Sequence, residues 1–342
     1  MFRSALSHSR PLVNKLARHM STMKAVVVER IGGPEVLEYK DHPKPQVSSG
    51  KILVKNHAIG VNFIDTYHRS GVYPLPTPFV PGREGSGEVV EVGEGVSDFK
   101  VGDRVAYVDA ESYAEYTAVN SLAAGKIPDN VSYDDATALL LQGLTAWTMV
   151  RDGYPVKKGD YVLVHAAAGG VGLLLCQMAN LLGATVIGTV STEEKAALAK
   201  ENGAHHTINY SHEDTVARVN EITNGQGCHA VLDGVGASTW ETSLQSVRRL
   251  GTLISFGNAS GVVPPIQISC LSDKSIKLMR PKLFSYLATR EDKEKWFNEL
   301  FQLQAEHKLK LRVHKTYKLE DAQSAHVDIQ SRKTTGKLLI EL

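Results

Sequence analysis

The chain has 342 residues, which is enough for about two domains, because a single hydrophobic core usually stops growing at a smaller size. Its 38 lysines and arginines nearly cancel its 37 aspartates and glutamates, which excludes a general electrostatic attraction to nucleic acid or to an anionic membrane. The number and spacing of its three cysteines argue against a disulfide framework and against a CxxC metal motif. No apolar run approaches the ~20 residues that cross a bilayer, so we expect no membrane insertion.

Residues 1–22 differ in composition from the rest of the chain. Four basic residues stand there: Arg3, Arg10, Lys15 and Arg18. Several serines accompany them, and no acidic residue appears before Glu29. This composition predicts a mitochondrial presequence that directs the protein to the matrix, with a plain N-terminal extension as the alternative. Met23 offers a second start, so the sequence also allows a shorter cytoplasmic form.

From residue 24 to about residue 146 the sequence is typical of a small antiparallel β domain. Short β-branched runs alternate there with glycine, proline and asparagine turn signals. The predicted strands cover residues 25–28, 52–56, 88–92, 103–108 and 113–119.

From residue 161 strands alternate with helices, which predicts a doubly wound parallel sheet. The predicted strands cover residues 161–165, 185–190, 206–209, 230–233 and 252–256. The first predicted helix begins at Gly170. The other predicted helices cover residues 192–202, 215–223 and 240–250. After a charged helix at 290–306, an apolar strand at 338–342 is expected to fold back onto the first domain.

A phosphate-binding turn is predicted between the first strand of this sheet and the apolar helix that follows it. Glycine at 169 would let the backbone approach a pyrophosphate, and glycine at 172 would let helix and strand pack closely. The helix N-terminus would add free N–H groups and a partial positive charge. Ala167 replaces the first glycine of the usual GxGxxG pattern. The predicted cofactor contacts are Ala168, Gly169, Gly170, Val171 and Gly172.

The end of the next strand predicts a preference for NADPH over NADH. An NAD-binding protein would carry an Asp or Glu there to accept the ribose hydroxyls. This chain has Val190, which cannot accept those hydrogen bonds, whereas Ser191 and Lys195 can bind a 2'-phosphate. Tyr210 follows the third strand and could cover the adenine. The predicted strand 252–256 ends near Phe256, Gly257 and Asn258, and we expect their backbone to contact the nicotinamide.

Four segments together carry a family resemblance: residues 60–71, 81–87, 141–146 and 166–172. With them, residues 23–342 resemble the medium-chain dehydrogenases/reductases, and within these the zinc-free quinone oxidoreductases similar to zeta-crystallin. The resemblance implies an α/β protein with a GroES-like antiparallel β catalytic domain at 23–146 and a Rossmann NADPH-binding domain at 147–278. Residues 279–342 would return to the catalytic domain.

No metal is expected in the site. Zinc needs thiolate or imidazole ligands at fixed positions. Where zinc-dependent alcohol dehydrogenases of this superfamily carry the catalytic Cys and His, this chain has Asn62 and Arg83. The cysteine-rich lobe that binds structural zinc in those relatives is also missing from the sequence.

Without a Lewis acid, reduction of an already electrophilic double bond is the chemistry that remains. Tyr67 is the predicted hydrogen-bond donor to the developing oxyanion and Asn62 the predicted positioning residue, because both lie on the loop that replaces the zinc-binding loop. The alternative is that Tyr67 only packs on the nicotinamide. The resemblance implies further contacts, with Gln142 and Thr145 near the carboxamide or ribose. It also places Arg280 on the acceptor side and Arg332 at the 2'-phosphate.

The resulting hypothesis is a homodimeric, NADPH-dependent reductase of quinones or related α,β-unsaturated carbonyls. A mitochondrial enoyl-thioester reductase is the enzymatic alternative. A side role in binding AU-rich RNA, associated with zeta-crystallin relatives, is the third reading, and the balanced charge disfavours it. We expect the dimer to form through edge strands of the nucleotide domain near residues 251–268.

Overall fold

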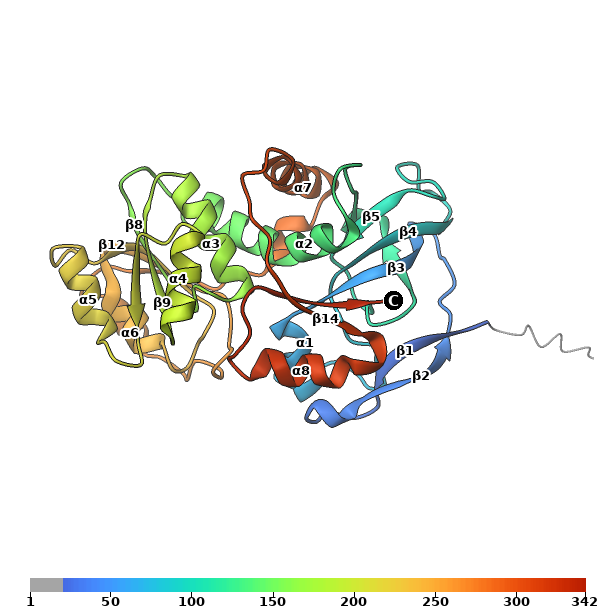
Figure 1. The fold of residues 1–342 in the computed structure, drawn as a ribbon, viewed down its shortest axis with the longest axis horizontal. Helices are drawn as coiled ribbons and strands as arrows, with labels where there is room; N and C mark the ends of the chain where they lie inside the picture. Colours follow the sequence, from blue (N-terminus) through green and yellow to red (C-terminus); the bar gives the residue numbers. More distant parts are fainter. Residues whose placement is uncertain (1–20) are drawn as a thin grey trace, which may run out of the picture.

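The computed structural model describes residues 21–342. Two bodies, each built on a sheet, lie at opposite ends of its longest axis (Figure 1). The predicted presequence lies outside the described residues, apart from its last two positions. None of the described helices combines the length and hydropathy that a bilayer-spanning segment requires.

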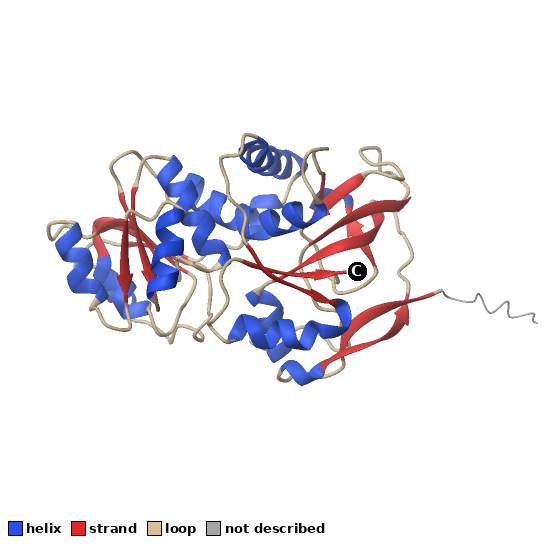
Figure 2. Ribbon diagram, viewed as in Figure 1, coloured by secondary structure: helices blue, strands red, loops and turns tan. Residues whose placement is uncertain are grey.

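One body contains a six-stranded parallel sheet in the order β10-β9-β8-β11-β12-β13. Its strands are β8 (Tyr161–Val164), β9 (Thr185–Val190), β10 (His206–Asn209), β11 (Cys228–Asp233), β12 (Val247–Ser255) and β13 (Lys277–Met279). Helices on its two faces are α3 (Gly170–Leu181), α4 (Glu193–Glu201), α5 (Thr215–Ile222) and α6 (Trp240–Ser246) (Figure 2). From β8 the chain adds β9 and β10 on one side, and then returns to add β11, β12 and β13 on the other side, as in dinucleotide-binding folds. This order confirms the predicted doubly wound sheet.

The other body contains a seven-stranded sheet in the order β14-β15-β3-β4-β5-β7, with β6 pairing β3. Its strands are β3 (Lys51–Val61), β4 (Gly85–Val92), β5 (Arg104–Tyr107), β6 (Tyr116–Asn120), β7 (Ala124–Lys126), β14 (Val313–Lys318) and β15 (Lys337–Glu341). Apart from the parallel β14–β15 pair it is antiparallel, which confirms the predicted antiparallel β domain. A separate antiparallel pair joins β1 (Thr22–Val28) and β2 (Leu37–Pro43).

Four helices complete this part of the molecule: α1 (Phe63–Ser70), α2 (Tyr133–Thr148), α7 (Arg290–Ala305) and α8 (Ala322–Gln330). The short helical turns are η1 (Pro34–Val36), η2 (Ser121–Ala123), η3 (Met149–Gly153), η4 (Ile268–Leu271), η5 (Leu283–Leu287) and η6 (Leu319–Asp321). Helix α2 packs on both β3 and α3, and so lies between the two bodies (Figure 1). It spans the predicted boundary at 146/147, and the domain limits stay predictions.

The C-terminal strand β15 pairs antiparallel with β3, so the end of the chain lies in the N-terminal sheet. Its side chains Leu338, Leu339 and Ile340 are buried, which removes their apolar surface from water and fixes the strand there. Immediately before it, the Gly336 N–H donates to the carbonyl of Ala168 in the predicted cofactor turn. The C-terminal segment therefore connects the two bodies beside that turn.

The predicted helix 240–250 is wrong beyond Ser246, because the chain enters β12 at Val247. A register shift between β11 and β12 leaves residues 248–251 as an irregularity, with Leu250 at φ +61°. Because this irregularity interrupts β12, the apolar alternation that would predict a strand begins only at about residue 252. The predicted dimer contact near residues 251–268 stays a prediction; of its strands, β12 pairs on both sides, and the edge strand of the sheet is β13.

Candidate active site

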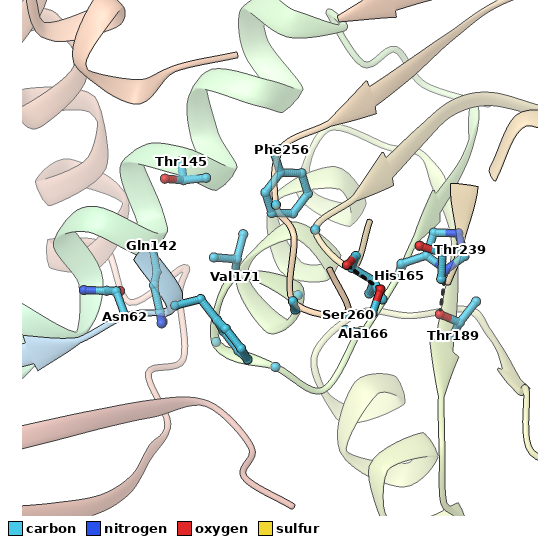
Figure 3. Close-up of a pocket in the computed structure, with 18 of the residues that line it drawn as sticks. Asn62, Gln142, Thr145, His165, Ala166, Val171, Thr189, Thr239, Phe256 and Ser260 are labelled. Atoms are coloured by element: carbon cyan, nitrogen blue, oxygen red, sulfur yellow. Dashed lines mark hydrogen bonds between the residues drawn. The ribbon is translucent and has the colours of Figure 1, made fainter. Parts of the chain in front are cut away.

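A cleft of about 1150 Å³ runs between the two bodies. All the predicted site residues line it except Asn258, which is buried just behind its wall. Figure 3 shows Asn62, Gln142 and Thr145 on one side of the cleft, with Phe256 and His165 across from them. The volume exceeds that of an ordinary small-molecule pocket and suits a dinucleotide together with a second ligand.

The turn before α3 has the close packing that was expected of a phosphate-binding turn. A Cβ atom on Gly172 would overlap the carbonyl oxygen of Ala166, and one on Gly170 would overlap the amide of Gln142. The cap residue Gly169 accepts from the Leu173 N–H, and the first N–H groups of α3 remain directed toward the cleft end of the helix. These residues fit a pyrophosphate, whose charge the helix N-terminus stabilises.

One end of the cleft carries the predicted 2'-phosphate residues. The Lys195 Nζ donates to the Arg332 carbonyl at 2.6 Å and to the Ser191 hydroxyl at 3.2 Å. Partial burial lowers the pKa of Lys195, although the side chain still lines the cleft. Val190 is buried beside it and Tyr210 is exposed at the rim. The structure therefore brings together all the residues that the sequence assigned to this end.

The other end of the cleft, which we call the tyrosine end, contains Tyr67 and Tyr73. The Asn258 N–H donates to the Tyr67 hydroxyl at 3.0 Å, and the Asn258 side chain donates to the Tyr73 hydroxyl at 2.9 Å. Arg280 also donates to the Tyr73 hydroxyl, at 3.0 Å. Burial raises the pKa of Tyr67 to about 12, so this phenol stays protonated at neutral pH and keeps its O–H for donation.

Asn62 is held by other side chains. Its amide donates to Glu84 at 2.7 Å and to the Gly60 carbonyl, and its oxygen accepts from Lys337 at 2.9 Å. Both amide hydrogens and one oxygen lone pair are thereby used within the protein. Asn62 forms part of the cleft wall with its side chain fixed, and its positioning role stays a prediction.

A buried polar cluster around Asp233 was not predicted from the sequence. Asp233 accepts from the hydroxyls of Thr239 and Ser243 and from the backbone N–H groups of Val235 and Gly236. Ser243 in turn lies 3.0 Å from the His165 ring. This cluster fixes the loop after β11, which also lines the cleft. The sequence signal was an acidic residue at the carboxyl end of an apolar strand.

Other residues at the tyrosine end were also missed as site residues. They are His68, Tyr73, Phe284 and Tyr286, and Arg83 joins them although it was noted only as a replaced zinc ligand. Tyr73 lies two residues beyond the 60–71 motif, and this proximity was the available signal. Within residues 21–342, His, Cys, Asp and Glu side chains form no cluster of three or more that would suit a metal ion.

Two family models match the chain. Residues 48–129 match the alcohol dehydrogenase GroES-like domain, and residues 170–302 match the zinc-binding dehydrogenase model. A quinone oxidoreductase of Pseudomonas aeruginosa is 45% identical over 322 residues, covering 93% of this chain and 99% of that protein.

Solved structures agree with these matches. The Escherichia coli quinone oxidoreductase complexed with NADPH is 42% identical, with a TM-score of 0.91 over 93% of this chain and all of that one. A mycobacterial protein complexed with NADPH is 45% identical, with a TM-score of 0.92 over 94% of this chain and all of that one. The chain therefore belongs to the quinone oxidoreductase family of the medium-chain dehydrogenases/reductases.

Proposed function

We propose that this protein is an NADPH-dependent reductase of quinones and related α,β-unsaturated carbonyls. The observation that carries this proposal is the single cleft that extends from Lys195 and Arg332 at one end to Tyr67 and Arg280 at the other. The relatives named above, which are called quinone oxidoreductases or contain NADPH, support the same reading.

The residues at each position have distinct tasks in this proposal. Lys195 and Arg332 hold the 2'-phosphate, and the turn at residues 168–172 holds the pyrophosphate. When bound, NADPH supplies a hydride to the acceptor. Tyr67 donates its O–H to the acceptor oxygen that gains negative charge, and the Asn258 N–H keeps the Tyr67 oxygen in place.

The test is NADPH oxidation by the purified protein with a panel of quinones, enones and enoyl thioesters, together with metal analysis of the same sample. Quinones turned over faster than a crotonyl thioester, without stoichiometric zinc, would support the proposal. Faster turnover of the thioester would select the enoyl-thioester reductase instead. Stoichiometric zinc would overturn the proposed metal-free chemistry.

We also propose that the protein is a homodimer and that residues 1–22 direct it to mitochondria. Val262 and Ile268, on the segment that connects β12 to the edge strand β13, are exposed apolar side chains within the predicted contact near residues 251–268, and they support a dimer contact. A monomer in light scattering would reject it. A reporter fused to residues 1–22 should enter mitochondria, and a diffuse cytosolic signal would leave this segment as a plain extension.

A further inference from the structure

Two arginines at the tyrosine end of the cleft have no carboxylate partner. Within residues 21–342 the arginines that pair with carboxylates are Arg151, Arg218 and Arg290. Arg83 instead lies 3.4 Å from the His68 ring and stacks over Phe284 at 5.2 Å. An unpaired guanidinium that lines a cleft attracts anions, and the attraction is stronger at the half-buried Arg83, because the surrounding protein screens its charge less than water does.

Arg280 has only neutral partners. Its guanidinium donates to the carbonyls of Ser255 and Gly257, to the Ser255 hydroxyl and to the Tyr73 hydroxyl. These four contacts fix the direction of the group and leave its positive charge uncompensated. The side chain itself is exposed at the rim of the cleft.

The segment between His68 and Tyr73 brings the two arginines into one part of the cleft. The His68 ring nitrogen lies 3.0 Å from the Tyr73 carbonyl, while the opposite nitrogen faces Arg83. Arg280 bonds the hydroxyl of the same tyrosine. Burial lowers the pKa of His68, so the ring is neutral at pH 7 and acts as an acceptor for Arg83. Lys282 adds a further exposed cation at this rim.

The acidic residues that line the cleft lie elsewhere. They are Glu213, Asp214 and Glu241, on the segments around α5 and α6 beyond Tyr210. Two of them are already engaged, since Glu213 pairs with Arg218 and Asp214 caps α5. The tyrosine end of the cleft is therefore positive, with no acidic side chain among the residues that line it there.

NADPH does not account for this positive charge. In the function proposed above, its phosphates lie at the turn 168–172 and beside Lys195. The nicotinamide that lies at the tyrosine end carries an uncharged carboxamide. An anionic partner for Arg83 and Arg280 would therefore come from the other ligand, the electron acceptor.

We propose that the enzyme prefers acceptors that carry an anionic group, namely quinones or enones bearing a carboxylate a few bonds from the reacting ring. This inference rests on the proposed reductase function and names the substrate class of the same site. A guanidinium binds a carboxylate through two parallel hydrogen bonds, which both attract and orient the acceptor. Phe284 and Tyr286 line the same end and provide an apolar wall for the ring. The carboxylate takes no part in the electron transfer.

The first experiment compares three acceptors on the wild-type protein with NADPH. A benzoquinone with a propanoate side chain is measured against its primary amide and against a trimethylammonium analogue of equal length. The saturated spacer keeps the quinone itself unchanged. We expect kcat/KM to fall from propanoate to amide to trimethylammonium, by about tenfold or more overall, and the differences to shrink as ionic strength rises. Equal values, or the reverse order, would overturn the inference.

Variants then locate the anion site. Arg83→Gln should lower the propanoate-to-amide ratio of kcat/KM by about tenfold, because one charge-assisted pair is lost. Arg83→Lys should retain part of the preference, and Arg83→Glu should reverse it. The matched control is Arg30→Gln, an exposed arginine outside the cleft, which should leave the ratio unchanged. An unaltered ratio in Arg83→Glu would refute the role of Arg83.

A binding measurement separates this inference from the proposed function. Calorimetry on the NADPH-loaded wild type compares 3-phenylpropanoate with 3-phenylpropanamide, and we expect the carboxylate to bind at least about tenfold more tightly. If no acceptor oxidises NADPH, the proposed reductase function is wrong, and this comparison still decides whether the anion site exists. Equal binding of the two compounds would overturn the inference even if quinones are reduced.

Discussion

Lys337 and Glu84 form an ion pair with side chains only 2% and 0% exposed to solvent. Lys337 belongs to the C-terminal strand β15, and Glu84 directly precedes β4. The second carboxylate oxygen of Glu84 accepts from the Leu141 N–H of α2, and both partners bond Asn62. The pair therefore connects strand β15, helix α2 and Asn62, which is the residue between β3 and α1.

Breaking this pair should destabilise the protein strongly. Lys337→Met leaves a buried carboxylate uncompensated, and we expect the free energy of unfolding to fall by about 3–5 kcal/mol in urea denaturation. Adding Glu84→Gln removes the unpaired charge and should recover part of that loss. Lys24→Met, which breaks an exposed pair with Asp41, is the control and should cost much less. Equal effects of the buried and exposed substitutions would contradict this account.

Cofactor preference should depend on Lys195. Lys195→Ala removes one charge-assisted hydrogen bond to a 2'-phosphate, so kcat/KM for NADPH should fall roughly 10- to 100-fold while that for NADH hardly changes. Adding Val190→Asp should favour NADH through its ribose hydroxyls and reverse the preference. Lys200→Ala, at an exposed lysine of the same helix, provides the control. If Lys195→Ala affects both cofactors equally, the lysine is structural.

Tyr67 should act as a neutral donor over an unusually wide pH range. Because its pKa is raised to about 12, the phenol keeps its proton through pH 10, and kcat should show no alkaline loss from this group below about pH 11. Tyr67→Phe should lower kcat by about 10- to 100-fold, as expected when a hydrogen bond to a developing charge is lost. Tyr39→Phe, at an exposed tyrosine, is the matched control. An unchanged kcat in Tyr67→Phe would indicate that Tyr67 only packs on the nicotinamide.

Two glycines of the cofactor turn should respond differently to the same added methyl group. The new Cβ in Gly172→Ala meets the rigid backbone carbonyl of Ala166, so we expect a stability loss of about 1–3 kcal/mol and a higher KM for NADPH. In Gly170→Ala the Cβ meets only the end of the Gln142 side chain, which can rotate away. Thermal melting and NADPH titration of both variants measure the difference, and a larger loss in Gly170→Ala would contradict it.

Local patterns determined much of the fold in advance. The strand from Thr185 to Val190 and the helix that begins at Gly170 agree with their predicted positions. Side-chain periodicity and turn residues act over a few positions, which makes such elements readable from one chain. The polar strand β14 was missed because five of its six side chains are exposed and give no apolar signal. Helix α8 was missed although Ala322, Ala325, His326 and Ile329 are buried at helical spacing, because alanine and histidine give only a weak apolar signal.

The sequence by itself determined the fold class and predicted the cofactor turn and the residues for the 2'-phosphate, because periodicity and turn residues act over short segments. Only the tertiary structure decided which distant side chains meet. Glu84 and Lys337 are 253 positions apart, and Tyr73 and Arg280 are 207 apart, yet each pair is in direct contact. A charge or hydroxyl in the sequence does not reveal its partner. Chain topology and burial bring the partners together and, by excluding water, determine how strongly they interact.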